Sequence, residues 1–335
     1  MKGVVIRGDG IAACCCAHLL ATAGIRVAME KAERTSVPAV LLSARTQALI
    51  GDVFGRRDLF AGLPRIEKRS VAWGRGSESL VLAHSSVIVS EGELAERLRP
   101  SGLVDGPESE WDPRWTILAS RPLPTSRVER RFGSRMASAL RVELARGIDS
   151  STCWIESLEC GWLFLIPSGD NAGWLLAVGG AHELLLAQSR IVAQLIESVR
   201  SNAGQFPAYP RIGDPLCGPG WLACGSAALA FDPLCGDGAG NAVREAILAA
   251  AIIRAEANGA HEQDVLAHYR GRLLAGFRKH LELCQQFYAA GHSGSWWNTE
   301  LDFLQEGIEW CARQMNDSKP FQYRLSGFEL HVISG

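Results

Sequence analysis

The feature that most constrains the fold is a glycine-rich turn close to the N-terminus. Apolar patterning predicts a strand, a helix and a second strand around this turn, over residues 3–7, 11–23 and 25–29. The turn between the first strand and the helix reads GDGIAA, which has the pattern G-x-G-x-x-A. A strand, a helix and a strand joined in this way are typical of a parallel α/β sheet with a right-handed crossover.

The same turn predicts a site for an adenine dinucleotide. Gly8 allows a tight turn, Gly10 lets a pyrophosphate approach the backbone, and Ala13 allows close packing of helix on strand. The start of the helix offers N–H groups and positive potential to phosphates. Glu30 can accept hydrogen bonds from ribose hydroxyls and would repel a 2′-phosphate, which favours FAD or NAD over NADP. The residues expected to bind the cofactor here are Gly8, Asp9, Gly10, Ala12, Ala13, Glu30 and Lys31.

A second glycine cluster, FDPLCGDGAGNA at residues 231–242, directly precedes a strongly helix-forming segment. Glycine costs about 0.5–1 kcal/mol per residue in regular structure, so the cluster indicates a backbone that comes very close to a ligand. If the first motif holds the ADP half of FAD, this loop and the helix start near Asn241 would face the flavin ring, whose reduced form is negatively charged. The residues expected to contribute are Asp232, Pro233, Gly236, Asp237, Gly238, Ala239, Gly240 and Asn241.

Composition excludes several other classes of protein. The 335 residues are 47% hydrophobic, which is ample for a full core, and the net charge of −2 gives no basic excess for nucleic acid or an anionic membrane. Charges interrupt the apolar stretches before they reach the ~18–20 residues of a membrane span. The ten cysteines form no CxxC pair and show no metal-ligand spacing with histidine. We therefore expect no metal and a reducing, cytoplasmic compartment.

The remaining pattern predicts an α/β (α+β) protein with two domains and a helical C-terminus. A discontinuous, Rossmann-like FAD-binding domain is expected over residues 1–65, 86–125 and 207–270. An inserted β-sheet substrate domain is expected over residues 66–85 and 126–206, and a helical region over 271–335. Within these limits the sequence predicts strands between 135 and 180, a helix over 182–199, and helices from 259 to about 315 with a short β-like end.

These motifs resemble those of the flavin-dependent aromatic monooxygenases of the para-hydroxybenzoate hydroxylase type and the related tryptophan halogenases. The family segments G-D-A-A and D-P-x-x-G-x-G are matched by GSAA at residues 225–228 and DPLCGDG at 232–238. LSAR at 42–45 and GWLFLIP at 161–167 are similar to two further family segments. The resemblance implies FAD as the cofactor, with contacts from Arg45, Gly225 and Ser226. Ser226 stands where the family has an aspartate that holds the ribityl chain, which implies a weaker contact.

The resemblance also implies an oxidoreductase that hydroxylates an electron-rich aromatic ring through a flavin C4a-hydroperoxide. Such an enzyme uses molecular oxygen and takes electrons from NAD(P)H or from a separate flavin reductase. A narrower resemblance is to the flavoprotein monooxygenases of tryptophylquinone biogenesis, of the quinohemoprotein amine dehydrogenase type, which implies an indole or tryptophan substrate, free or held in a peptide or protein. The candidate substrate residues are Trp73, Trp162, Phe164, Trp296 and Trp297.

Three alternatives stay open. A flavin halogenase needs a lysine between flavin and substrate; Lys68 is the one catalytic candidate, but Arg65 lies nearer to the family spacing, and arginine is no substitute for an amine. A solvated charge is the favoured explanation of Lys68, and packing between C-terminal helices is that of the pair Trp296 and Trp297. A reductase of the same fold acting on prenyl chains, or a module that only binds FAD, would also fit the glycine motifs.

Overall fold

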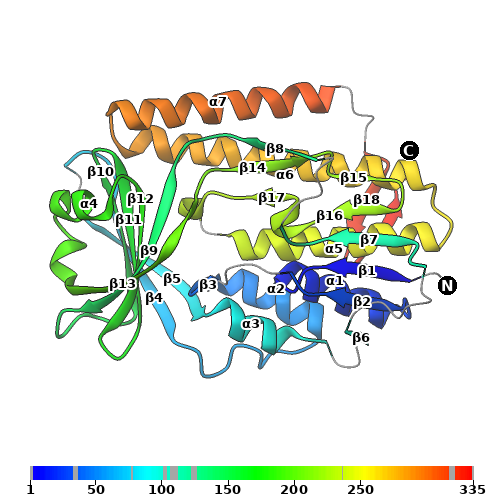
Figure 1. The fold of residues 1–335 in the computed structure, drawn as a ribbon, viewed down its shortest axis with the longest axis horizontal. Coiled ribbons are helices and arrows are strands. Elements are labelled where there is room, and N and C mark those ends of the chain that lie inside the picture. Colours follow the sequence, from blue (N-terminus) through cyan, green and yellow to red (C-terminus); the bar gives the residue numbers. More distant parts are fainter. Residues whose placement is uncertain are drawn as a thin grey trace.

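The computed structural model describes residues 3–32, 37–76, 78–100, 104–105, 112–121, 127–235, 237–316 and 321–333. Gly236, one of the predicted cofactor residues, lies outside these ranges. Two large sheets occupy opposite ends of the molecule (Figure 1). Two long helices, α6 (Glu262–Gly291) and α7 (Ser295–Asn316), lie side by side along one face and span both ends. The predicted helical C-terminal part is therefore present.

The six-stranded sheet is built around the N-terminal motif. Its strand order is β15-β16-β7-β1-β2-β6, and β1 pairs in parallel with β2 and with β7. The predicted unit of strand, helix and strand is confirmed as β1, α1 and β2. The bounds are β1 Val4–Arg7, α1 Ile11–Thr22, β2 Val27–Glu30, β6 Val104–Asp105, β7 Trp115–Leu118, β15 Cys217–Gly218 and β16 Trp221–Ala223.

Helix α1 is buried on nearly every side, which explains its run of small apolar residues. Cys14, Cys15 and Cys16 lie in the core, and the helix packs against α5 (Gly238–Ala257). Cysteine and alanine are small enough to let two helices and the sheet approach closely. The three consecutive cysteines are therefore core residues, and no disulfide joins any described cysteine.

The eight-stranded sheet has the order β13-β9-β12-β11-β10-β4-β5-β3 and confirms the sheet predicted between residues 135 and 180. Its pairs are antiparallel except for β4 with β10. Segments expected at the FAD-binding end, residues 40–43 and 86–89, pair here as β3 and the end of β5, so the domain division stays a prediction. The bounds are β3 Val40–Ser43, β4 Arg65–Ala72, β5 Leu80–Val89, β9 Met136–Leu144, β10 Thr152–Leu158, β11 Gly161–Gly169, β12 Ala172–Gly179 and β13 Ile196–Pro207.

The helix predicted over residues 182–199 is wrong beyond its first half. Helix α4 covers only His182–Gln188, a short 3-10 turn (Ala193–Leu195) follows, and β13 forms the edge of the large sheet. The buried carboxylate of Glu156 accepts hydrogen bonds from the backbone N–H groups of Arg190 and Val192 at 2.7 and 3.0 Å. These contacts hold the chain in a turn, and pairing with β9 outweighs the local helical preference.

The other elements connect the two sheets. Helix α2 begins after Ser43, whose Oγ accepts a hydrogen bond from the Thr46 N–H at 3.2 Å, as an N-cap does. The predicted β-like end is confirmed as a hairpin, β18 with β19. The remaining bounds are α2 Ala44–Phe54, α3 Glu91–Leu98, β8 Val128–Arg131, β14 Arg211–Asp214, β17 Leu229–Ala230, β18 Tyr323–Ser326, β19 Glu329–Val332, and the 3-10 turns η2 Gly225–Ala227 and η3 Pro233–Cys235.

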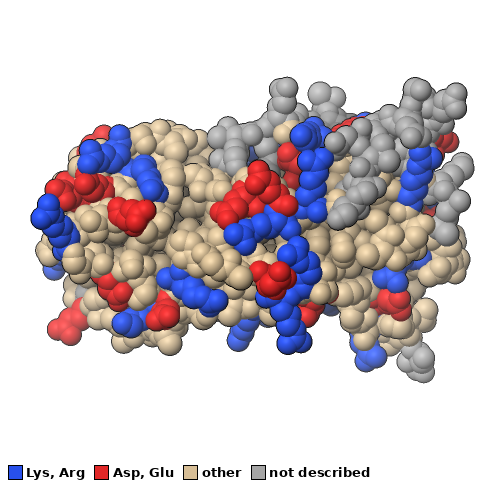
Figure 2. Space-filling view, turned by 90° about the horizontal axis from the view of Figure 1, so that it is seen from below, with Lys and Arg blue, Asp and Glu red and all other residues tan. Residues whose placement is uncertain are grey.

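The surface agrees with the near-neutral net charge. Figure 2 shows basic and acidic side chains intermingled on the face seen from below, with no extended patch of one sign. Among the helices that the structure describes, none is both long and apolar enough to cross a membrane.

Candidate functional site

The N-terminal motif forms a backbone cradle at the start of α1. Gly8 has a φ of +133°, and a Cβ at this position would collide with the side chain of Ser120. Gly10 precedes α1 without a side-chain cap, and the first turn carries no acidic residue. The first N–H groups of α1 are therefore open to an anion, as at phosphate-binding helix starts. Asp9 is half-buried in the turn, and Ala13 is fully buried beneath it.

Glu30 lies at the end of β2, beside this cradle. The N–H of Gly8 donates to the Glu30 carbonyl oxygen at 2.8 Å, which fixes the turn against β2. The Glu30 carboxylate accepts a hydrogen bond from Arg7 Nε at 2.9 Å, and both side chains are partly exposed. A ribose at this edge would share the carboxylate with Arg7. Lys31 follows with an exposed side chain.

The second glycine motif forms the start of α5. The carboxylate of Asp237 accepts a hydrogen bond from Thr46 Oγ1 at 2.7 Å and pairs with Arg244, so α2 holds the beginning of α5 in place. A Cβ at Gly240 would lie 2.7 Å from Thr46 Oγ1, which explains the glycine. The side chain of the N-cap residue Asp237 does not cap the first N–H groups of α5, and the helix begins at Gly238, close to the predicted position.

Two adjoining cavities connect the motifs. One of about 280 Å³ is lined by Gly10, Ala12, Gly225, Ser226 and other residues at the starts of α1 and α5. One of about 300 Å³ is largely apolar and reaches the eight-stranded sheet. The residues lining both are Val37, Val40, Phe231, Gly238 and Ala239. The cavities therefore form one path from the α1 cradle, past the start of α5, to the face of the large sheet.

Glu245 is a buried carboxyl that sequence reasoning missed. Its Oε2 accepts a hydrogen bond from the Gly225 N–H at 2.7 Å, while Oε1 has no partner among the described residues. Burial raises the pKa of Glu245 to about 8, so the group is mostly protonated at pH 7. It lines the 280 Å³ cavity together with Ser226. A carboxyl therefore lies close to the position where the family motif has its aspartate.

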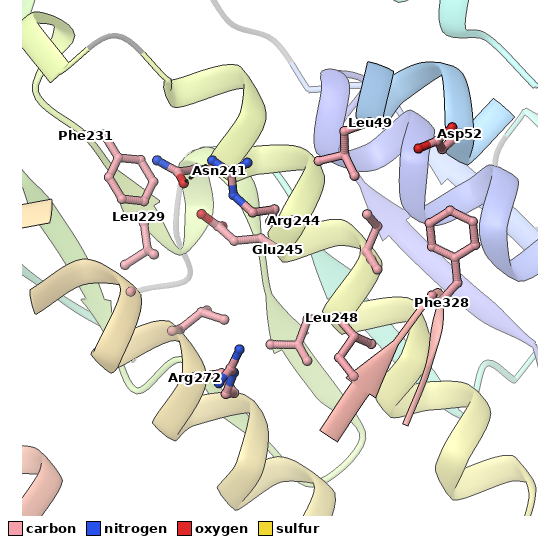
Figure 3. Close-up of a pocket in the computed structure, with 15 residues that line it drawn as sticks. Leu49, Asp52, Leu229, Phe231, Asn241, Arg244, Glu245, Leu248, Arg272 and Phe328 are labelled. Atoms are coloured by element: carbon pink, nitrogen blue, oxygen red, sulfur yellow. Dashed lines mark hydrogen bonds between the residues drawn. The ribbon is translucent and has the colours of Figure 1, made fainter. Parts of the chain in front are cut away.

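Glu245 also lines a third cavity, of about 480 Å³, which shares Leu229 and Phe231 with the 280 Å³ cavity. Figure 3 shows this cavity between α2, α5, α6 and the C-terminal hairpin, with Arg272 and Phe328 on its walls. Asn241, predicted to face the cofactor, lines this third cavity and accepts a hydrogen bond from Arg244 at 3.0 Å. Glu245 therefore stands between two cavities.

Asp232 belongs to a buried ionic network. One oxygen accepts hydrogen bonds from Arg135 Nε at 2.7 Å and Tyr288 OH at 2.9 Å, and the other from the Leu234 N–H at 2.8 Å. Arg135 also pairs with Glu300 of α7, and all three charged side chains are fully buried. The Asp232 carboxylate therefore fixes η3, while Pro233 on this turn lines the apolar cavity.

The five predicted substrate residues lie in two places. Phe164 lines the apolar cavity, and Trp162, two residues earlier on β11, is fully buried and donates to Tyr288 OH at 3.2 Å. Trp73, Trp296 and Trp297 form an aromatic cluster, in which Trp297 contacts both other rings edge-on. Of the five, only Phe164 is among the described residues that line the apolar cavity.

Lys68 and its neighbour Arg69 point to opposite faces of β4. Lys68 is exposed and forms an ion pair with Asp149 at 3.5 Å, whereas Arg69 lines the apolar cavity, 5.9 Å from the Phe164 ring centroid. Arg69 Nη2 donates to His84 Nε2 at 3.2 Å. Burial and the nearby Arg69 lower the pKa of His84 to about 4, so this ring is a neutral acceptor. Arg45 is exposed in the first turn of α2 and is not among the described residues lining either of the two cavities.

The fold of this chain is that of the flavin-dependent halogenases and aromatic monooxygenases. The flavin-dependent halogenase CmlS superposes with a TM-score of 0.77 at 17% identity, over 94% of this chain and 71% of that one. The myxobacterial chondrochloren halogenase CndH gives 0.75 at 16% identity, over 95% and 91%. The peptidyl tryptophan dihydroxylase QhpG, essential for tryptophylquinone cofactor biogenesis, gives 0.72 at 18% identity, over 89% and 78%.

These similarities confirm the predicted fold resemblance. No protein-family model matches the chain, and no curated protein matches its sequence. At such low identities the similarity extends to the fold, and the chemistry has to be argued from the site itself.

Proposed function

We propose that this chain binds FAD and hydroxylates an aromatic ring with molecular oxygen. The observation that carries the proposal is the path formed by the two adjoining cavities. It begins at uncapped N–H groups of α1, passes the uncapped start of α5, and ends in an apolar space lined by aromatic side chains. This order of a phosphate site, a second helix start and an apolar space suits FAD with an aromatic substrate beyond it.

The residues present fit the cofactor. Gly8, Gly10 and the first turn of α1 would hold the pyrophosphate, and Glu30 would bind the adenosine ribose. Gly225, Ser226 and Glu245 would surround the ribityl chain, because all three line the cavity between the two helix starts. The N–H groups of Gly238 and Ala239 would face the flavin ring, where positive potential favours the reduced, anionic form. When bound, FAD supplies the electrons and the activation of oxygen.

Hydroxylation is favoured over halogenation by the cationic group in the apolar cavity. The described residues that line this cavity include Arg69 but no lysine, and a guanidinium cannot act as an amine nucleophile. Arg69 would instead donate hydrogen bonds to a carboxylate or carbonyl of the substrate. The aromatic lining from Phe164 and Trp174 suits an electron-rich ring such as indole.

We further propose tryptophan, free or within a peptide or protein, as the substrate. The similarity to QhpG supports the peptide-bound form and a role in tryptophylquinone biogenesis. Electrons would come from NAD(P)H or from a separate flavin reductase. The abundance of small, buried cysteines favours a reducing, cytoplasmic compartment. A halogenase and a prenyl-chain reductase of the same fold are the competing functions.

The experiment that tests the function starts from purified protein titrated with FAD and followed by its visible spectrum. The reduced protein is then given oxygen, chloride and bromide together with tryptophan or a tryptophan-bearing peptide. A mass gain of about 16 units per transferred oxygen supports hydroxylation. A chlorine or bromine isotope pattern would identify a halogenase, and saturation of a prenyl double bond without oxygen consumption would identify a reductase.

A matched pair of variants separates the substrate cavity from the aromatic cluster. Phe164→Ala, in the cavity, is expected to reduce kcat/KM by about tenfold, since aromatic contacts contribute about 0.5–1.5 kcal/mol beyond area burial. Trp296→Ala, in the cluster, is expected to leave kcat/KM unchanged. Equal losses in both variants would mean that the substrate lies elsewhere.

A further inference from the structure

Two cysteines far apart in the sequence meet beside the second glycine motif. Cys235, the last residue of η3, and Cys284, on α6, have their Sγ atoms 3.3 Å apart. Cys235 is partly exposed and Cys284 is fully buried. A disulfide has an S–S distance of about 2.05 Å, so a small movement of side chains would join them.

His280 lies one helical turn before Cys284 and completes the cluster. Its Nε2 accepts a hydrogen bond from the Asp232 N–H at 2.9 Å, so this nitrogen carries no proton. Cys284 Sγ lies 3.3 Å from the same nitrogen, and the thiol is therefore the donor of that contact. Burial lowers the pKa of His280 to about 4, which agrees with a neutral ring. Burial, together with the contact to Cys235, raises the pKa of the Cys284 thiol well above its usual range, so Cys284 loses its proton only as its sulfur attacks.

The same three side chains also approach one another as metal ligands do, with the two Sγ atoms and a ring nitrogen of His280 all within 4.8 Å. Two observations argue against a metal. The lone pair of His280 Nε2 already accepts the Asp232 N–H, and a structural zinc site needs four ligands, whereas the described residues offer three here. The geometry favours reaction between the sulfurs.

We propose that Cys235 and Cys284 are a peroxide-reactive pair that forms a reversible disulfide. Hydrogen peroxide oxidises the partly exposed Cys235 thiol to a sulfenic acid and releases one water. Cys284 sulfur then attacks Cys235 sulfur, its proton passes to the departing oxygen, the S–O bond breaks, and a second water leaves. Two thiols have then given two electrons to one peroxide, and a dithiol reductant restores them.

The position of the pair gives the disulfide a structural consequence. Asp232, Pro233 and Leu234, which precede Cys235, line the apolar cavity, so a bridge from Cys235 to α6 would tie that wall to the long helix. In the proposed flavoenzyme, peroxide would arise next to this wall whenever oxygen reacts without substrate; this clause alone rests on the proposed function. The disulfide chemistry needs only the folded chain and peroxide.

The chain contains its own control pair. Cys16 and Cys224 have Sγ atoms 3.9 Å apart, but both are fully buried and Cys16 donates to the Ala246 carbonyl oxygen. Peroxide cannot reach either sulfur without unfolding, and no histidine contact is found there among the described residues. This pair should stay reduced under conditions that oxidise Cys235.

The experiment treats the full-length protein, with and without added FAD, with hydrogen peroxide, blocks the remaining thiols by alkylation and maps the peptides without reduction. We expect a Cys235–Cys284 peptide, an intact mass lower by about two units for the two hydrogens lost, reversal by dithiothreitol, and unmodified Cys16 and Cys224. In Cys284→Ser, whose fold is checked by thermal melting, dimedone should trap a sulfenic acid at Cys235.

Three results would overturn the proposal. One is oxidation of Cys235 without a disulfide to Cys284, a result that can be observed in the wild-type protein itself. Another is equal oxidation of Cys16 and Cys224, which would indicate unfolding. The third is a stoichiometric metal in the purified protein that is lost in Cys284→Ser. Failure of FAD binding in the spectral titration would leave the result of the peptide map readable on its own.

Discussion

The two ends of the molecule present different kinds of atoms to the cavities between them. At the six-stranded sheet three glycines, Gly10, Gly225 and Gly238, present their backbone to the cavity. At the eight-stranded sheet it is lined by side chains that project from strands, such as Phe164 and Arg69. A site formed by backbone atoms depends on which residues are glycine. A site formed by side chains depends on which face of each strand points into the cavity.

That difference determines how robust each end is to change. Along a strand, side chains alternate between the two faces, so a shift of one residue exchanges them. Lys68 and Arg69 illustrate this, since one faces solvent and its neighbour faces the cavity. The glycine cradle has no such alternation, and substitution there acts by filling the space that a ligand needs.

The largest expected effect concerns the ionic network that joins the two ends. Arg135 precedes β9 of the large sheet and pairs with Asp232, beside the glycine motif, and with Glu300 of α7. Arg135→Met leaves two buried carboxylates without their cation, which is expected to lower the free energy of unfolding by about 3–5 kcal/mol. Urea denaturation would measure it.

The control is Arg200→Met on the same sheet, where Arg200 pairs with Glu143 at the exposed surface. That pair should contribute at most about 1 kcal/mol. If Arg135→Met lowers the free energy of unfolding by no more than the control does, the attachment of the two ends does not depend on this network.

The comparison also explains what the sequence could predict. The strand, helix and strand around Gly8 and Gly10 were predictable because a contiguous motif determines both the turn and its ligand. Glu245 was missed because nothing in an alanine-rich helix indicates that one carboxyl meets the N–H of Gly225, twenty residues earlier. The end of the helix at 182–199 was missed because Glu156, on another strand, terminates it.

At the eight-stranded sheet the sequence predicted the strands but could not predict which face of each strand lines the cavity. Trp162 and Phe164 share a face of β11, yet Phe164 lines the cavity and Trp162 is covered by Tyr288 from α6. The meeting of Cys235 with Cys284 likewise follows from the packing of η3 on α6. Such contacts arise from tertiary structure and leave no local pattern.

The next effect concerns pH and tests the buried carboxyl at the backbone end. The pKa of Glu245 is about 8 in the folded chain, against an ordinary value of 4.5. Between these values the folded state keeps a proton that the unfolded state releases, so stability falls as pH rises and levels off above about 8. Relative to Glu245→Gln, the wild-type protein should lose up to about 1.4 kcal/mol per pH unit between pH 5 and 7.

Urea midpoints of both proteins at pH 5, 6 and 7 would measure this difference, because other titrating groups cancel in the comparison. If the free energies of unfolding of the two proteins change with pH in parallel, Glu245 has an ordinary pKa in the folded chain. It would then line the proposed ribityl site as a carboxylate anion.

A smaller effect tests the cradle itself. Gly10→Val places a branched side chain where the pyrophosphate would approach, and FAD affinity should fall by about tenfold or more, which is at least about 1.4 kcal/mol. Gly92→Val on α3 is the matched control, since a Cβ there meets nothing within 4 Å. Fluorescence titration with FAD distinguishes them, and unchanged affinity in a folded Gly10→Val protein would contradict the assignment.

The smallest expected effect asks whether the backbone end can be improved by a side chain. Ser226→Asp restores the carboxylate that the family has at this position, and FAD affinity should rise by about fivefold, because a hydrogen bond to a charged group contributes about 1 kcal/mol more than one to a neutral group. Glu245 lines the same cavity but is mostly protonated at pH 7. Repulsion between its carboxyl group and the introduced aspartate should therefore be weak at pH 7 and should grow as the pH rises through 8. Titrations with FAD at pH 7 and 9 would therefore show that the gain in FAD affinity of the variant is smaller at the higher pH. Equal or weaker binding at pH 7 in a folded variant would mean that Glu245 already serves the ribityl chain and that position 226 has no part in holding it.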